Sequence, residues 1–132
     1  MIIYRIVNLV NLFNMKILIC DDDKMTIRAL EFQLKNEGFE IIKAVNGREA
    51  MNILESNDDI DLLIADLYMP FVNGMELITY IRETLQRDTP IIIITLTKVE
   101  DKVRQAFELG ANSFLTKPID VDELANEIKK YF

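Results

Sequence analysis

Four consecutive isoleucines, at positions 91–94, constrain the fold more than any other stretch of the chain. Because neighbouring side chains of a strand point to opposite faces of its sheet, a strand with this sequence is apolar on both faces. Strands of this kind are typical of parallel sheets that are covered by helices on both sides. The run therefore predicts an α/β fold.

The chain from Met15 onward repeats one pattern, a short apolar run followed by a segment of helical period. The runs predict strands over residues 16–20, 40–43, 62–65, 91–95 and 113–115. Between and after them, apolar residues recur at helical spacing, as Ile27, Leu30 and Leu34 do. This alternation predicts five strands, five helices and a parallel sheet, in one domain over residues 15–132.

Signals for helix ends agree with these segments. Capping-box spacing joins Asn46 with Glu49 and Asp120 with Glu123, which predicts that helices begin there. Gly38 and Gly110 follow helical stretches, where a residue with left-handed backbone conformation is expected.

Composition removes several classes of function. The formal net charge of −7 opposes direct binding to nucleic acid. The absence of histidine excludes histidine-based triads and most zinc sites, and the single cysteine, Cys20, lies in an apolar run typical of an inert buried thiol. A reducing, cytoplasmic location fits this cysteine usage. Residues 1–14 resemble neither a signal peptide nor a membrane span, and we interpret them as an extension or an upstream start.

Chemically useful side chains follow four of the five predicted strands. Right-handed crossovers place the carboxyl ends of parallel strands along one edge of the sheet. At that edge we expect the carboxylates of residues 21–23, then Asp66, Thr95 and Lys117, the last followed by Pro118. A loop of three carboxylates disfavours a bound phosphate cofactor and favours a hard cation. Mg²⁺ prefers oxygen ligands of the kind that Asp21, Asp22 and Asp66 supply.

Each of these residues has an ordinary structural interpretation when it is taken alone. Three aspartates after a strand are typical of a solvated turn, Thr95 suits any strand, and Lys117 suits any surface. Their joint placement at one edge favours function over these interpretations, because a reactive site requires several groups in mutual reach. For Phe114, a core role and a functional role are equally supported.

The ordered set of motifs resembles the receiver domain of response regulators, the phosphoaccepting module of two-component signalling. The resemblance covers residues 15–132 and rests on residues 17–23, 61–70 with Gly74, Thr95, and 114–118. It implies a doubly wound five-stranded parallel sheet in the flavodoxin-like order 2-1-3-4-5, with helices on both faces. It also implies a small conformational switch in which Thr95 moves toward the phosphoryl group and Phe114 turns inward.

The resemblance assigns the remaining roles residue by residue. Asp66 accepts the phosphoryl group, Thr95 and Lys117 contact it, and the Lys117–Pro118 peptide is cis. The metal ligands are Asp21, Asp22, Asp66 and the main-chain carbonyl of Tyr68, with Mg²⁺ as the cofactor. Pro70 and Gly74 shape the loop after the acceptor.

The resemblance also implies partners. The donor is a phosphohistidine on a histidine kinase or a histidine phosphotransfer protein, and the output is a downstream protein target, with no direct contact to nucleic acid or membrane. A homodimer through the fourth helix, fifth strand and fifth helix fits the same pattern. The chemistry is Mg²⁺-dependent self-phosphorylation with slow self-dephosphorylation, and not enzymatic turnover.

Three positions depart from the family pattern or modify it. Leu96 stands where a small residue is usual, and its bulk is expected to narrow access to Asp66 or restrain Thr95. Phe114 lacks the hydroxyl of the tyrosine often found there. Tyr68 is expected to shield the acyl phosphate from water. Apart from these three positions, Met25 is a candidate docking contact for a histidine-bearing partner helix.

Three alternatives stay open at this point. The chain can be an interaction module that signals without phosphorylation, which Leu96 and Phe114 favour. It can also be a receiver cut from a longer regulator. A phosphatase of the haloacid-dehalogenase type ranks last, because such enzymes carry a second aspartate two residues after the nucleophile and this chain has Tyr68 there.

Overall fold

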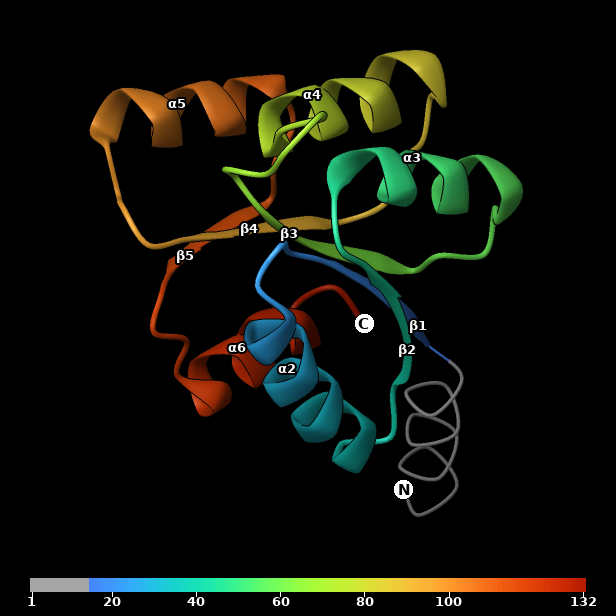
Figure 1. Cartoon of the computed structure of the whole chain (residues 1–132), viewed down its shortest axis with the longest axis vertical. Coiled ribbons are helices and arrows are strands. Elements are labelled where there is room, and N and C mark those ends of the chain that lie inside the picture. The colour runs from blue at the N-terminus through green and yellow to red at the C-terminus, as the bar shows by residue number, and fades with distance from the viewer. Residues whose placement is uncertain (1–14) are drawn as a thin grey trace.

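The computed structural model describes residues 15–132, so the predicted N-terminal extension lies outside the described residues. A five-stranded parallel sheet forms the centre, in the order β2-β1-β3-β4-β5 (Figure 1). The strands are β1 (Lys16–Cys20), β2 (Glu40–Ala44), β3 (Leu62–Asp66), β4 (Ile91–Thr95) and β5 (Ser113–Thr116). The predicted fold class and strand order are confirmed.

Helices cover both faces of this sheet. They are α2 (Lys24–Asn36), α3 (Gly47–Ser56), α4 (Gly74–Thr79), α5 (Glu100–Leu109) and α6 (Val121–Lys129), and α4 runs on into a π-helical segment, η1 (Tyr80–Thr84). Figure 1 shows α3, α4 and α5 on one face of the sheet and α2 with α6 on the other. Within residues 15–132, no helix combines the length and the apolar character that crossing a bilayer requires.

The four isoleucines of β4 divide between the two faces as their alternation requires. Ile91 and Ile93 belong to the hydrophobic core beneath α3, α4 and α5, whereas Ile92 and Ile94 belong to the core beneath α2 and α6. All four side chains are fully buried. Burial of this apolar surface stabilises the fold, at about 25 cal/mol per Å².

The strand and helix ends refine the sequence prediction. β3 extends one residue further than predicted, so Asp66 is the last residue of the strand and not the first one after it. β2 and β5 are likewise one residue longer. The predicted caps are present, since the Asn46 side chain accepts a hydrogen bond from Glu49 N at 2.8 Å, and Gly38 and Gly110 have φ values of 97° and 121°.

One helix start escaped the sequence analysis. Asn73 and Glu76 form a complete capping box at the beginning of α4, in which each side chain accepts a hydrogen bond from the other residue's backbone amide. The signal was present in the sequence, because the spacing equals that of Asn46 and Glu49. This cap fixes where the loop after Asp66 ends.

We call the edge of the sheet where the strands begin the amino edge. A hydrogen-bond network around two arginines covers this edge. Arg82, on η1, donates to the carbonyl oxygens of Gly110 and Arg87 and to the side chain of Asn112, at 2.8 to 3.2 Å. Arg87 donates to the carbonyls of Leu54 and Asn57, at the end of α3, at 2.8 and 3.1 Å. These bonds tie three helix ends together.

Candidate functional site

The opposite edge, where the strands end, we call the carboxyl edge, and Asp66 lies at its centre. The residue ends β3 and is only 7% exposed. Its Oδ1 accepts a hydrogen bond from Tyr68 N at 3.1 Å, and its Oδ2 accepts one from Lys117 Nζ at 2.9 Å. Gly74 packs behind it so closely that a Cβ atom there would lie 2.7 Å from Asp66 O. Each carboxylate oxygen is therefore fixed by one hydrogen bond, and the close approach of Gly74 fixes the main chain of Asp66.

Asp21, which follows β1, is fully buried beside Asp66. Its Oδ1 accepts a hydrogen bond from Asp23 N at 2.9 Å. Its Oδ2 lies 2.7 Å from Lys117 Nζ, its ion-pair partner. Burial raises the pKa of the Asp21 carboxyl, and the hydrogen bond and charge of Lys117 offset only part of that rise.

Lys117 is the residue after β5, and its side chain lies between the two carboxylates. Its side chain is 11% exposed. Burial by itself lowers the pKa of this ammonium group, but Asp21 and Asp66 together outweigh burial and hold the pKa above its ordinary value. Lys117 is therefore a fixed cation at neutral pH. The Lys117–Pro118 peptide is cis, as the family resemblance implied.

Thr95 ends β4 next to these charges. Its side chain is fully buried, and within the part of the chain that the structure describes its hydroxyl oxygen has no hydrogen-bond partner. A buried hydroxyl without a partner costs roughly 1–3 kcal/mol, so its retention favours a ligand that completes it. Phe114, which pairs with Ile93 in the sheet, is half-buried against the core beneath α5.

The donor set fits a hard cation. Asp21, Asp22 and Asp66 each offer a carboxylate oxygen, and these oxygens all lie within 4.8 Å of one another. Asp21 Oδ2 and Asp66 Oδ2 lie 2.7 and 2.9 Å from Lys117 Nζ, so these oxygens already attract positive charge. Oxygen ligands with mixed burial, two carboxylates buried and Asp22 exposed, suit Mg²⁺, which keeps several of its waters.

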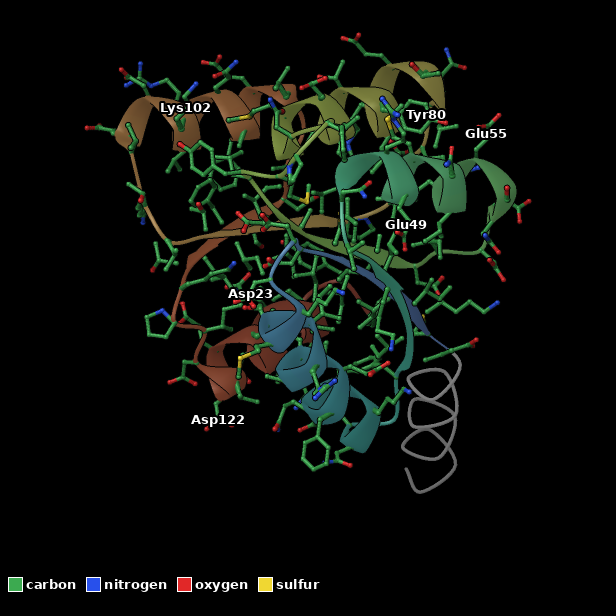
Figure 2. The ribbon with its side chains drawn as sticks, viewed as in Figure 1. Asp23, Glu49, Glu55, Tyr80, Lys102 and Asp122 are labelled. Atoms are coloured by element: carbon green, nitrogen blue, oxygen red, sulfur yellow. The ribbon has the colours of Figure 1, made fainter. Side chains whose placement is uncertain are left out.

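A pocket of about 540 Å³ opens over these residues. Its polar groups come from the acidic loop and the strand ends, and its remaining wall is apolar. The lining consists of Asp22, Asp23, Thr26, Ala29, Leu30, Asp66, Tyr68, Thr95, Leu96, Lys117, Pro118, Ile119 and Val121. Asp23 lies where the chain passes from β1 into α2, near the strand ends (Figure 2).

The structure brings Asp66, Thr95 and Lys117 to one pocket, with Asp21 paired to Lys117, whereas Phe114 and Met25 do not line that pocket. Tyr68 and Leu96 also line the pocket, but both side chains are exposed, Leu96 at 76%, so Leu96 forms part of the rim. Asp23 caps α2 by accepting hydrogen bonds from Met25 N and the Thr26 hydroxyl. The sequence analysis missed the lining residues contributed by α2 and the segment after Pro118, because helical periodicity assigns such residues to packing alone.

Comparison with known proteins agrees with this geometry. The family model of the response regulator receiver domain matches residues 17–129. The transcriptional regulatory protein CrdR of Helicobacter pylori is 36% identical over 117 residues, which cover 89% of this chain and 54% of that protein. The transcriptional regulatory protein CpxR of Escherichia coli K12 is 39% identical over 114 residues, which cover 86% and 47%.

The chain therefore spans about half the length of these curated relatives. A solved structure, that of a two-component response regulator from Clostridium difficile, superposes with a TM-score of 0.84 at 28% identity. That match covers 89% of this chain and 95% of the solved one.

Proposed function

The chain belongs to the response regulator receiver-domain family, whose members accept phosphoryl groups in two-component signalling, and from that premise we propose that Asp66 is the phosphoryl acceptor. One observation carries the proposal. Asp66 shares the Lys117 ammonium with Asp21, and the hydroxyl of Thr95, buried and without a hydrogen-bond partner in residues 15–132, lines the same pocket. A carboxylate nucleophile, a cation and a free hydroxyl are the groups that phosphoryl transfer requires.

In the proposed reaction, a carboxylate oxygen of Asp66 attacks phosphorus and forms the P–O bond of an acyl phosphate. The P–N bond of a phosphohistidine breaks, and its electron pair stays on the imidazole nitrogen. Lys117 and Thr95 donate to the phosphoryl oxygens. Asp21, Asp22, Asp66 and the carbonyl of Tyr68 would hold Mg²⁺, which would neutralise charge on the phosphoryl oxygens. Pro70 and Gly74 keep the loop in place, and Tyr68 slows self-dephosphorylation by shielding the product.

The consequence of transfer is a shift between two packings. The Thr95 hydroxyl gains a partner only in the phosphorylated state, so phosphate favours the packing in which Thr95 has moved toward it. Phe114 is half-buried and takes the space that Thr95 leaves. The surface that changes comprises α5, β5 and α6; Phe107 on α5 and Val99, the residue before α5, are exposed there. A histidine kinase or phosphotransfer protein supplies phosphate, and this surface contacts a downstream protein or a second copy.

A second candidate is a receiver that works as the regulatory part of a longer protein. It is favoured by the coverage of the curated relatives, both named transcriptional regulatory proteins, of which this chain matches about half. In that case contact with DNA belongs to another part of the protein, since the net charge of −7 opposes binding by this one.

The acceptor is tested by incubating the protein with Mg²⁺ and acetyl phosphate and recording the intact mass. The wild type gains the mass of one phosphoryl group, and Asp66→Asn gains none. Asp101→Asn, on the exposed start of α5, is the matched control and labels like the wild type. Labelling of Asp66→Asn equal to that of the wild type overturns the assignment. A parallel incubation with EDTA tests the requirement for the metal.

A further inference from the structure

The pocket over Asp66 has more room than the acceptor chemistry uses. Its volume of about 540 Å³ lies in the range of roughly 300–1,000 Å³ that is typical of pockets for small organic ligands. A phosphoryl group and a metal ion would occupy the end that holds Asp66, Lys117 and the carboxylates of Asp21 and Asp22. The rest of the pocket is open to another part of a bound molecule.

This remaining part has an aliphatic wall, which we define as Ala29, Leu30, Pro118, Ile119 and Val121. Ala29 and Leu30 belong to the second turn of α2, and the other three to the segment that leads from β5 into α6. These two helices lie on the same face of the sheet (Figure 1). Leu30 is buried, whereas Ala29 and Pro118 are exposed. Apolar surface left open inside a pocket is typical of contact with a ligand.

The geometry of phosphoryl transfer determines which part of a donor meets the aliphatic wall. Attack and departure are roughly in line, so the leaving group lies on the side of phosphorus opposite the attacking oxygen. Asp66 is 7% exposed and ends a central strand, so that opposite side faces the open part of the pocket. A chain attached to the leaving group extends there, and the uncharged wall favours a hydrocarbon chain over a charged one.

An acyl phosphate with a short aliphatic chain matches both parts of the pocket. Its anionic phosphoryl end suits the Lys117 ammonium and a metal ion held by the carboxylates, and its chain suits the wall. When an Asp66 oxygen attacks, a new P–O bond forms, the bond between phosphorus and the acyl oxygen breaks, and a carboxylate leaves with the electron pair. Acetyl phosphate carries only a methyl group, so it covers less of the wall than a longer chain does.

We propose that the aliphatic wall is a subsite for the hydrocarbon chain of an acyl phosphate, and that the receiver takes phosphate from butyryl phosphate and similar donors in preference to acetyl phosphate. The inference rests on the proposed function, because it requires Asp66 to accept the phosphoryl group. The reaction that supplies such a donor is phosphorylation of a carboxylic acid or phosphorolysis of its thioester.

The test compares acetyl, propionyl and butyryl phosphate as donors in the presence of Mg²⁺. Second-order rate constants of labelling are measured by intact mass, and each is divided by the rate constant of the same donor with hydroxylamine, which removes differences in intrinsic reactivity. We expect the corrected constant of butyryl phosphate to exceed that of acetyl phosphate about fourfold. This is roughly twofold for each added methylene group, because the wall covers the chain on one side only.

Variants of the wall change the ratio of the butyryl to the acetyl constant. Ala29→Leu fills the subsite from an exposed position of α2 and brings the ratio to about one, and Ile119→Ala removes contact and lowers it. Ile119→Val keeps most of the contact and most of the ratio. The control is Phe32→Ala, which removes an exposed apolar side chain of the same helix outside the pocket and leaves the ratio unchanged. Circular dichroism verifies that each variant is folded.

A second measurement detects the subsite without phosphoryl transfer. Propylphosphonate and pentylphosphonate have the chain lengths of acetyl and butyryl phosphate, but their P–C bond does not transfer the phosphoryl group. Calorimetry in Mg²⁺ gives their dissociation constants. We expect pentylphosphonate to bind about fourfold more tightly than propylphosphonate to the wild type, and the two to bind equally to Ala29→Leu.

The outcomes separate this inference from the proposed function. If no donor labels the wild type, the acceptor assignment fails and the donor preference fails with it. If all three donors label Asp66 with equal corrected constants and the two phosphonates bind equally, the acceptor stands and the subsite is wrong. A chain-length preference that persists in Ala29→Leu also overturns the inference, because it shows that the chain is bound outside the aliphatic wall.

Discussion

The two edges of the sheet treat buried polar groups in opposite ways. At the amino edge, Arg82 and Arg87 donate to main-chain carbonyls, and the Asn112 side chain accepts from both Ile91 N and Arg82. At the carboxyl edge, within residues 15–132, the Thr95 hydroxyl is buried without a hydrogen bond, and the Asp21 and Asp66 carboxylates share the Lys117 ammonium. At the amino edge, charged side chains hold main-chain segments together. At the carboxyl edge, they are placed to bind a ligand.

The difference shows that the fold tolerates a destabilising buried polar group at the carboxyl edge. A buried polar group without a partner is costly, and a fold retains one where binding supplies the missing partner. The carboxyl edge gathers three carboxylates that can hold a metal ion, with a single lysine between two of them. The comparison therefore predicts opposite results for substitutions at the two edges.

Removal of the lysine should have the largest effect. Lys117→Met leaves Asp21 and Asp66 buried without a cation, and we expect the free energy of unfolding in EDTA to fall by about 3 kcal/mol. Mg²⁺ should restore most of the loss, because it brings positive charge to the same carboxylates. Urea unfolding with and without Mg²⁺ measures both quantities. Lys102→Met, on α5, is the exposed control, and a Lys117→Met protein as stable as this control would contradict the prediction.

At the amino edge, loss of Arg82 should destabilise the protein without changing its chemistry. Arg82→Ala removes donors from Gly110, Arg87 and Asn112, which predicts a loss of about 2 kcal/mol in the free energy of unfolding. Labelling by acetyl phosphate should stay at the wild-type rate under conditions where the variant is folded. Arg82→Lys keeps the charge but not the fork of donors, so we expect an intermediate stability. A change in labelling rate would show that the two edges are coupled.

The sequence predicted the carboxyl edge better than the amino edge, for a physical reason. Chain topology alone brings the ends of parallel strands together, so Asp21, Asp66, Thr95 and Lys117 could be placed side by side without knowledge of any side-chain conformation. Because of that placement, these four residues could be distinguished from ordinary surface residues. The unpaired state of the Thr95 hydroxyl could not be predicted, since it depends on atomic positions.

The amino edge depends on details that hydrophobic pattern does not encode. Arg82 reaches Gly110 from the π-helical segment η1, which continues the periodic stripe of α4 and has no separate signal in the sequence. At the carboxyl edge, in the loop after β3, the γ-turn at Phe71 was also not predictable; it has φ of 69° and a hydrogen bond from Val72 N to Pro70 O at 2.8 Å, a conformation that phenylalanine does not favour. The Lys117–Pro118 cis peptide came only from the family resemblance.

Neutralising one buried carboxylate should stabilise the protein. Asp21→Asn removes a charge whose pKa burial raises, so we expect the free energy of unfolding in EDTA to rise by about 1 kcal/mol at pH 7. The folded-state pKa lies above the unfolded one, so the wild type loses stability as pH rises through it, and the gain in Asp21→Asn shrinks toward zero at low pH. Stabilisation by Mg²⁺ should disappear in the variant. A destabilised Asp21→Asn protein would show that the ion pair with Lys117 outweighs burial.

Near the amino edge, neutralising the Glu127 carboxylate should lower the free energy of unfolding, in contrast to Asp21→Asn. This should be the smallest of the predicted effects. Glu127, on α6, accepts hydrogen bonds from Lys130 Nζ at 2.7 Å and from Ser113 Oγ, at the start of β5, at 2.8 Å. Both bonds favour the charged form and lower the pKa of this carboxyl. Glu127→Gln should therefore cost about 0.5 kcal/mol at pH 7, since the side chain is partly exposed and its charge is screened by solvent.

The pH dependence of this variant separates the two edges most directly. The folded-state pKa of Glu127 lies below the unfolded value of about 4.5, so the stabilisation is present above that value and is lost as pH falls through the folded-state pKa. The wild type should exceed Glu127→Gln in stability at pH 7 and match it at low pH, whereas Asp21→Asn should exceed the wild type at pH 7 and match it at low pH. Glu108→Gln, on the exposed side of α5, supplies the baseline. Deviations of the same sign at both sites would mean that overall charge, and not local pairing, governs these carboxylates.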